Sequence, residues 1–313
     1  MRLGMLAGYL PWRDPAGRFS WLKLGVLLVL LGPAADLLLR LLTHDLGPRP
    51  LNQATHVTGD WTVRFLLASL AVTPLSAVLN WPRLVILRRM LGVGSACYTG
   101  FHVLLYCADQ KWNLLVVASE IVLRIYLTIG FVAFAGLMVL AVTSTDGWQK
   151  RLRQRWKRLH RLVFPIAVLA LLHYFLQSKA DVTAAVFAAG VFVWLMLWRL
   201  APRRFQARLW LMAALALAAP AATAGIEGLW YALATGVRAA RVLAANLDPS
   251  AMRPSLEVLL CAATVLLLAI VQRLRDRRGS SKSRSPSPSR LSPSTEAVMA
   301  RPGNTASKGA RKI

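Results

Sequence analysis

The chain has 313 residues, 56% of them hydrophobic, and its 38 Lys and Arg outweigh 13 Asp and Glu to give a formal net charge of +25. This apolar content excludes an ordinary soluble domain, because several apolar runs approach the length that crosses a bilayer. The charge does not indicate nucleic-acid binding, since the basic residues stand in short blocks between apolar runs and in the tail, as in membrane proteins with basic cytoplasmic loops.

Six apolar helices are expected to cross the membrane after a short basic lead at 1–23. Asp36 and Arg40 lie one turn apart in the first helix, so we expect them to neutralise each other. The polar segments between the helices are expected to be loops, and 82–89 a short basic connector. The helices are expected at 24–42, 62–79, 90–107, 121–142, 162–176 and 182–200, and the loops at 44–61, 108–120 and 178–181.

Two weaker apolar runs follow, at 209–233 and 256–271, within an extension that covers 201–271. From 272 to 313 the chain is rich in Arg, Ser and Pro and has too few apolar residues for a core, so we expect a basic disordered tail near anionic lipid headgroups. The sequence therefore predicts an all-α integral membrane protein. It comprises a six-helix domain at 24–200, two extra transmembrane helices and the tail.

The basic residues mark every second connection between these helices. Positively charged loops stay in the cytoplasm. This rule places the N-terminus, the 82–89 connector and the basic block 149–161 in the cytoplasm, and the loops between them on the other side. With eight membrane crossings, the C-terminus is also expected in the cytoplasm.

Two histidines stand deep inside predicted membrane helices. His102 is about twelve residues into a helix that rises from the cytoplasm, and His173 is about eleven residues into another. At 1.5 Å per residue, both lie roughly 16–18 Å from the cytoplasmic edge. Two imidazoles at one depth on separate helices suit the two axial positions of haem b. The alternative is two unrelated buried histidines, each hydrogen-bonded to a backbone or hydroxyl group.

His160 precedes His173 by thirteen residues, which places the two about 140° apart on a straight helix, although Pro165 between them can rephase it. A second haem at His160 would require a histidine near the start of the third helix, where Arg88 and Arg89 stand instead. Cations at that level suit a phosphate.

These residues predict a flavin mononucleotide site at the cytoplasmic face, formed by the two arginines with Trp156 and His160. The alternative is a basic rim whose side chains extend to the headgroups. Near the opposite rim, Arg64, Arg124 and Lys179 are candidates to pair with haem propionates, and the alternative there is ordinary interface anchoring.

Six motifs recur in order in a known family. They are WTVRFLLASLAVTPL (61–75), RLVILRRMLG (83–92), HVLLY (102–106), VTSTDGWQKRL (142–152), WKRLHRLVF (156–164) and LLHYFLQSKAD (171–181). With these motifs the chain resembles, from about residue 59 to 199, the MsrQ family. This family comprises the haem-binding membrane subunits of bacterial protein-methionine-sulfoxide reductase systems, within the ferric-reductase-like transmembrane domains.

The resemblance implies a subunit that carries haem b and FMN and passes electrons across the bacterial inner membrane. The acceptor would be a periplasmic molybdenum-cofactor subunit that reduces methionine sulfoxide in oxidised proteins, and the donor the quinone pool or a cytosolic flavin reductase. The family's functional histidines fall on His102, His160 and His173, and its arginine pair on Arg88 and Arg89. The sulfoxide chemistry would belong to the partner.

Two other functions remain open from the sequence. One is a ferric or quinone-linked reductase that uses the same helices. The other is a non-redox transporter or scaffold, which would have a substrate path lined by Asp36, Glu120 or Glu227. The family does not explain the roughly hundred residues that follow the sixth helix.

Overall fold

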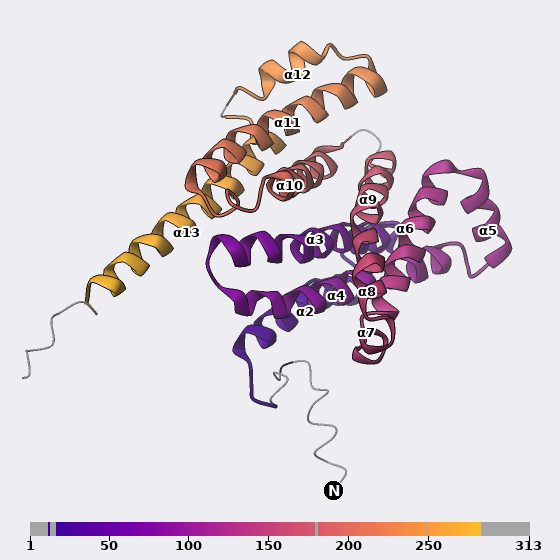
Figure 1. Cartoon of the computed structure of the whole chain (residues 1–313). Coiled ribbons are helices and arrows are strands. Elements are labelled where there is room, and N and C mark those ends of the chain that lie inside the picture. The colour runs from indigo at the N-terminus through magenta and orange to yellow at the C-terminus, as the bar shows by residue number, and fades with distance from the viewer. Residues whose placement is uncertain (1–11, 13–16, 179–180, 249, 283–313) are drawn as a thin grey trace, which may run out of the picture. The chain divides into compact units, whose positions relative to one another are not determined.

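The structure is a computed structural model that describes residues 12, 17–178, 181–248 and 250–282. Eight helices in this part of the chain are long and apolar enough to cross a membrane, and residues up to Gln272 form one compact unit. The protein is therefore an all-α, multi-pass membrane protein, as predicted. Its helices are labelled in Figure 1.

The six helices expected before residue 200 are all present. Their bounds are α2 (Trp21–Leu42), α3 (Pro50–Val78), α4 (Leu87–Asp109), α6 (Ile125–Val142), α9 (Val163–Gln177) and α10 (Thr183–Leu200). A short 3-10 helix, η1 (Pro82–Ile86), forms the connector before α4. In α2, Arg40 and Asp36 form the expected ion pair at 3.0 Å.

The apolar core joins α3, α6, α9 and α10. Leu66 and Leu70 of α3 are almost fully buried there, against Leu137 of α6, Ile166 of α9 and Leu195 of α10. A larger share of α3 is buried than of any other candidate span. α3 is therefore the central helix around which the others are arranged.

The segment 44–61 is helical from Pro50 onward, so its prediction as a loop was wrong. Proline at the first helical position costs no hydrogen bond. The hydroxyls of Thr55, Thr58 and Thr62 then donate to carbonyls four residues earlier, at 2.7, 2.9 and 3.0 Å. These bonds satisfy the hydroxyls within the helix itself, so the polar residues after Pro50 can form the first turns of a helix that is apolar further along.

The predicted loop 108–120 contains most of a further helix, α5 (Leu114–Leu123). The Asn113 side chain caps α5 by accepting the N–H of Val116 at 3.2 Å. The chain is extended at Arg124, so the expected 121–142 helix is divided there and α6 begins at Ile125. With ten residues, α5 is too short to cross a bilayer.

The basic block forms two short helices and one 3-10 turn, which are α7 (Asp146–Leu152), α8 (Gln154–Leu159) and η2 (His160–Leu162). Arg153, with a φ of 45°, separates α7 from α8. Because His160 lies in the 3-10 turn η2 and His173 in α9, the rotation between the two is not that of one straight α-helix.

The extension contains α11 (Leu209–Thr235), α12 (Ala239–Ala245) and α13 (Pro254–Lys282). Both extra membrane helices are present, and the connection between them holds α12. The last helix was expected to end at 271 and continues to Lys282. The tail was predicted to be disordered from 272 to 313. This prediction was wrong for 272–282, which continue α13, and 283–313 lie outside the described part of the chain.

Candidate functional site

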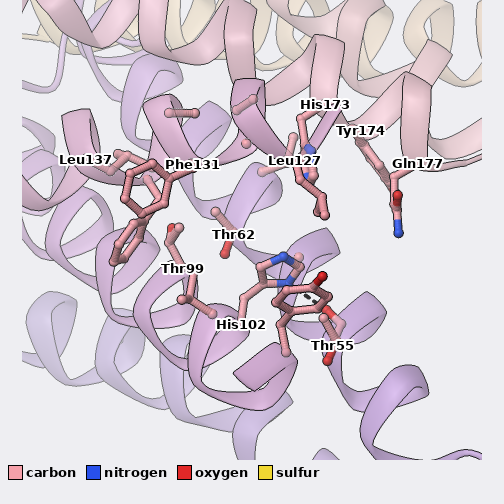
Figure 2. Close-up of a pocket in the computed structure, with 18 of the residues that line it drawn as sticks. Thr55, Thr62, Thr99, His102, Leu127, Phe131, Leu137, His173, Tyr174 and Gln177 are labelled. Atoms are coloured by element: carbon pink, nitrogen blue, oxygen red, sulfur yellow. Dashed lines mark hydrogen bonds between the residues drawn. The ribbon is translucent and has the colours of Figure 1, made fainter. Parts of the chain in front are cut away.

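Two imidazoles face each other between α4 and α9. The ring centroids of His102 and His173 are 6.4 Å apart, and the ring planes are almost perpendicular, at 88°. Figure 2 shows the two side chains approaching each other from opposite walls of a cavity. The structure thus brings together the histidines that were expected to share a depth.

Each ring is fixed by a backbone carbonyl. His102 Nδ1 lies 2.8 Å from the Thr55 carbonyl oxygen, and His173 Nδ1 lies 2.8 Å from that of Tyr126. A carbonyl only accepts hydrogen bonds, so Nδ1 carries the proton in both rings and Nε2 keeps its lone pair. A hydrogen bond of this kind also orients a metal-binding imidazole and raises its basicity.

The surroundings of the two histidines are repeated. In both cases the carbonyl lies 47 residues before the histidine, and a glycine follows that carbonyl by one helical turn. A Cβ at Gly59 would lie 3.2 Å from the His102 ring, and one at Gly130 would lie 2.7 Å from His173 Nδ1. The pair α3–α4 and the pair α6–α9 therefore present their imidazoles in the same way.

The cavity around the histidines has a volume of about 320 Å³, within the range of small-molecule sites. Most of its lining is apolar and includes Phe131, Phe134 and Leu137. Asp60 is the only carboxylate among the described residues that line it. The cavity thus combines a largely water-excluding wall with two available imidazole nitrogens.

This arrangement fits haem. Imidazoles that bind opposite faces of one iron, through metal–nitrogen bonds of about 2 Å, place their ring centroids roughly 6 Å apart, and 6.4 Å is observed. No group of three or more His, Cys, Asp or Glu among the described residues could hold a metal ion. His102 and His173 would hold haem, and its porphyrin would supply the other metal ligands.

A second cavity, of about 380 Å³, lies at the end of the bundle that carries the basic block. It is lined by the four residues predicted to form a flavin site, which are Arg88, Arg89, Trp156 and His160. The Trp156 and His160 rings stack with centroids 3.9 Å apart. Leu137 lines both cavities, so only a few side chains of α6 and its neighbours separate the two sites.

Some polar groups of this second cavity already have hydrogen-bond or ion-pair partners within the chain. His160 contacts Ser144 Oγ through Nε2 and the Trp156 carbonyl through Nδ1, both at 3.2 Å. Arg89 pairs with Asp146 at 2.5 Å. Among the described residues, no ion pair involves Arg88, so its charge is available to an anion in the cavity.

Arg89 and His160 also occupy matching positions in the repeat, thirteen residues before His102 and His173 respectively. The second cavity therefore has an imidazole, His160, just before α9 of the α6–α9 pair, and a guanidinium, Arg89, at the matching position of the α3–α4 pair.

Of the residues predicted to bind haem propionates, Arg64 and Arg124 do not line the histidine cavity. Arg64 lies over the Trp61 ring, 4.8 Å from its centroid. Arg124 donates to Glu120 at 3.0 Å, and its hydrogen bond to the Tyr126 hydroxyl raises the pKa of its guanidinium. Lys179 is outside the described residues. Their role as propionate partners stays a prediction.

The three carboxylates that a transport path would use are each held by an arginine. Asp36 pairs with Arg40, Glu120 with Arg124, and Glu227 with Arg253. Neither cavity contains any of the three in its lining. The described structure therefore gives no support to a substrate path lined by these groups.

Four groups of the site were missed by the sequence reasoning. The Thr55 and Tyr126 carbonyls carry no side-chain signal, and Gly59 and Gly130 were not singled out. The spacing shared by the two glycines and the two histidines was the signal that could have identified them.

Comparisons with known proteins show what the chain is similar to. Residues 58–171 match the family of ferric reductase like transmembrane components. The chain is 40% identical over 168 residues to the protein-methionine-sulfoxide reductase heme-binding subunit MsrQ of Xanthomonas oryzae pv. oryzae, which covers 52% of this chain and 77% of that relative. It is also 40% identical over 178 residues to the MsrQ subunit of Caulobacter vibrioides, covering 56% and 84%. No solved structure matches the chain.

Proposed function

The chain belongs to the MsrQ family of heme-binding subunits, and we propose that it carries electrons through the membrane by means of a haem b held between His102 and His173. A haem bound there would supply reversible one-electron transfer. The proposal rests above all on two facing imidazoles whose Nδ1 atoms are both bound to carbonyls. This leaves both Nε2 atoms available as ligands.

The other residues of the cavity have defined tasks in this proposal. The Thr55 and Tyr126 carbonyls orient the rings and increase their basicity. Gly59 and Gly130 leave space for the imidazoles where any side chain would crowd them. Apolar side chains such as Phe131 and Leu137 restrict water, and restricted solvent access helps to set a reduction potential.

We assign FMN to the second cavity as part of the same proposal. An arginine without a carboxylate partner is a suitable phosphate ligand, and the stacked Trp156 and His160 offer an aromatic surface beside it. Because Leu137 borders both cavities, electrons would have a short path from the flavin to the haem.

The acceptor in this proposal is a periplasmic molybdenum-cofactor methionine sulfoxide reductase, and the donor is the quinone pool or a cytosolic flavin reductase. Asp60 is the only carboxylate among the described residues that line either cavity, so no carboxylate pair for acid–base chemistry is present there. We therefore place the sulfoxide chemistry on the partner. The chain would lie in the bacterial inner membrane with both termini in the cytoplasm.

The haem assignment is tested by reduced-minus-oxidised absorbance spectra of protein expressed with ample haem. A b-type signal is expected in the wild type and should be lost in His102→Ala and in His173→Ala. His44→Asn is the control, because His44 lies outside both cavities and its φ of 57° suits asparagine. A wild type without any b-type signal would overturn the proposal.

The flavin assignment is tested by extraction of FMN from purified protein. The double variant Arg88→Ala/Arg89→Ala should lose FMN while the haem spectrum stays. Arg83→Ala is the matched control, since Arg83 is a neighbouring exposed cation that does not line the cavity. Unchanged FMN in the double variant would mean that the phosphate is bound elsewhere.

A further inference from the structure

The extension after residue 200 packs closely on the haem domain. Gly190 of α10 faces both Thr223 of α11 and Val258 of α13, and a Cβ at this glycine would lie 2.9 Å from Val258 Cγ2 and closer still to the Thr223 hydroxyl. Helices in membranes associate through small residues that allow their backbones to approach. The three helices therefore meet at one tightly packed junction.

From this junction, α11 reaches the helix that carries His173. The Trp230 and Phe175 rings lie 5.0 Å apart between centroids. Phe175 belongs to a buried cluster with Val182 and Val186 of the α10 segment, against which Tyr174 and Trp230 also pack. Tyr174 lines the histidine cavity, next to His173 in sequence and in Figure 2. The extension thus contacts α9 at Phe175, the residue that follows Tyr174 of the cavity wall.

A buried polar cluster fixes α11 in turn. Glu227, only 2% exposed and one turn before Trp230, accepts hydrogen bonds from Arg253 at 2.9 Å and from Asn246 at 2.7 Å. Ser255 donates to the other side of the Asn246 amide at 2.6 Å. A buried carboxylate with all its partners in place resists displacement, because removing any partner leaves a costly uncompensated group. The cluster therefore holds Trp230 against α9.

We propose that the extension positions the haem-binding histidine, with Trp230 as the positioning residue and the Glu227 cluster as its support. His173 is fixed on its other side by the Tyr126 carbonyl and by close contact with Gly130 of α6. α9 is thus held between α6 and α11, and His102 has no such contact with the extension in the described structure. The inference rests on the proposed function, because an effect on haem requires that His173 binds haem. The packing of α11 on α9 does not require haem and can be measured without it.

The experiment compares Trp230→Ala and Trp230→Phe in the full chain, with Leu229→Ala as control. Leu229 is the preceding residue of α11 and is 58% exposed, so its truncation changes the apolar content of the same turn without touching α9. Hydrogen exchange of the α9 segment around His173 is measured without haem, and the haem midpoint potential and the rate of haem loss to an acceptor protein are measured in loaded protein.

Trp230→Ala should accelerate hydrogen exchange of α9. It should also speed haem loss roughly tenfold, as for other supporting residues of metal sites. In the protein that still binds haem, the midpoint potential should be lower. The potential should fall because water that enters the loosened site favours the more highly charged oxidised iron. Trp230→Phe should restore most of each property, and Leu229→Ala should match the wild type. General loss of stability alone would not move the potential of molecules that remain folded and loaded.

The outcomes separate the two proposals. If the wild type binds no haem, the proposed function fails, and the exchange of α9 still decides whether the extension positions it. If haem binds but α9 exchange and the potential in Trp230→Ala equal those of Leu229→Ala, the positioning role is overturned while the haem assignment stands.

Discussion

At the scale of single residues, the site depends on backbone groups as much as on its histidines. Each imidazole has its Nδ1 atom bound to a carbonyl, and the centroids of the two rings are 6.4 Å apart. Neutral imidazoles with this tautomer are ready to bind a metal without prior loss of a proton. Under the proposed function, both histidines would therefore be prepared as ligands before a cofactor binds.

Gly130 should be the most sensitive small residue of the site. The added methyl of Gly130→Ala would lie 2.7 Å from His173 Nδ1, and the ring cannot move away without breaking its 2.8 Å bond to the Tyr126 carbonyl. We expect a loss of about 1–3 kcal/mol in stability from overpacking, with weaker haem retention, measured by thermal unfolding and haem content.

Gly100→Ala is the control for this substitution, because a Cβ there meets no atom within 4 Å. It should be neutral or slightly stabilising, since alanine is the better helix former. Equal behaviour of the two variants would show that His173 is free to move.

The sequence predicted the residues of the site better than their surroundings. His102 and His173 could be paired because depth along a helix follows directly from residue count. Thr55 and Tyr126 could not be found in this way, because they act through carbonyls that every residue possesses. For Arg64 and Arg124, the sequence did not show that one lies over a tryptophan and the other pairs with a glutamate.

At the scale of elements, the hydrophobic pattern identified the eight candidate membrane helices of the described chain but missed the polar first turns of α3 and the short helix α5. α3 starts at Pro50 because its threonines satisfy their own hydroxyls, and this property is not visible in hydropathy. The early start has a functional consequence, since Thr55 lies in the part of α3 that was expected to be a loop. Polar character alone was therefore a poor guide to where the helix begins.

The packing of α10 against the extension gives a prediction at this scale. Gly190→Ala should destabilise the protein by about 1–3 kcal/mol, because its methyl would overlap Thr223 and crowd Val258. Adding Thr223→Ala should recover part of the loss by removing the closest atoms. Gly225→Ala in α11, where a Cβ meets no atom within 4 Å, should be close to neutral. Thermal unfolding in one detergent provides the comparison, and a double variant no better than Gly190→Ala would contradict the proposed junction.

At the scale of the whole molecule, the positions of the two cavities and the pattern of basic residues together indicate a direction for the proposed electron transfer. The second cavity carries the arginines and adjoins the basic block, and the histidine cavity lies nearer the other end of α4 and α9. If basic segments stay in the cytoplasm, electrons would enter beside Trp156 and leave beyond His173. If all eight candidate spans cross the membrane, the chain would return to the side on which it started.

This orientation can be tested by labelling with a membrane-impermeant thiol reagent. Asn52→Cys, exposed at the start of α3, should react in intact spheroplasts. Lys150→Cys, exposed in the basic block, should react only after permeabilisation. Both variants are made in a background without the three native cysteines, which are all free thiols. The opposite labelling pattern would reverse the assigned orientation.

The most direct test of the central claim is an electron paramagnetic resonance spectrum of the oxidised, haem-loaded protein. Two axial imidazoles with ring planes near 88° should give a strongly anisotropic low-spin ferric signal. That signal should disappear in His102→Ala and in His173→Ala and persist in His44→Asn. An unchanged low-spin signal in either cavity variant would show that these two histidines do not bind one iron.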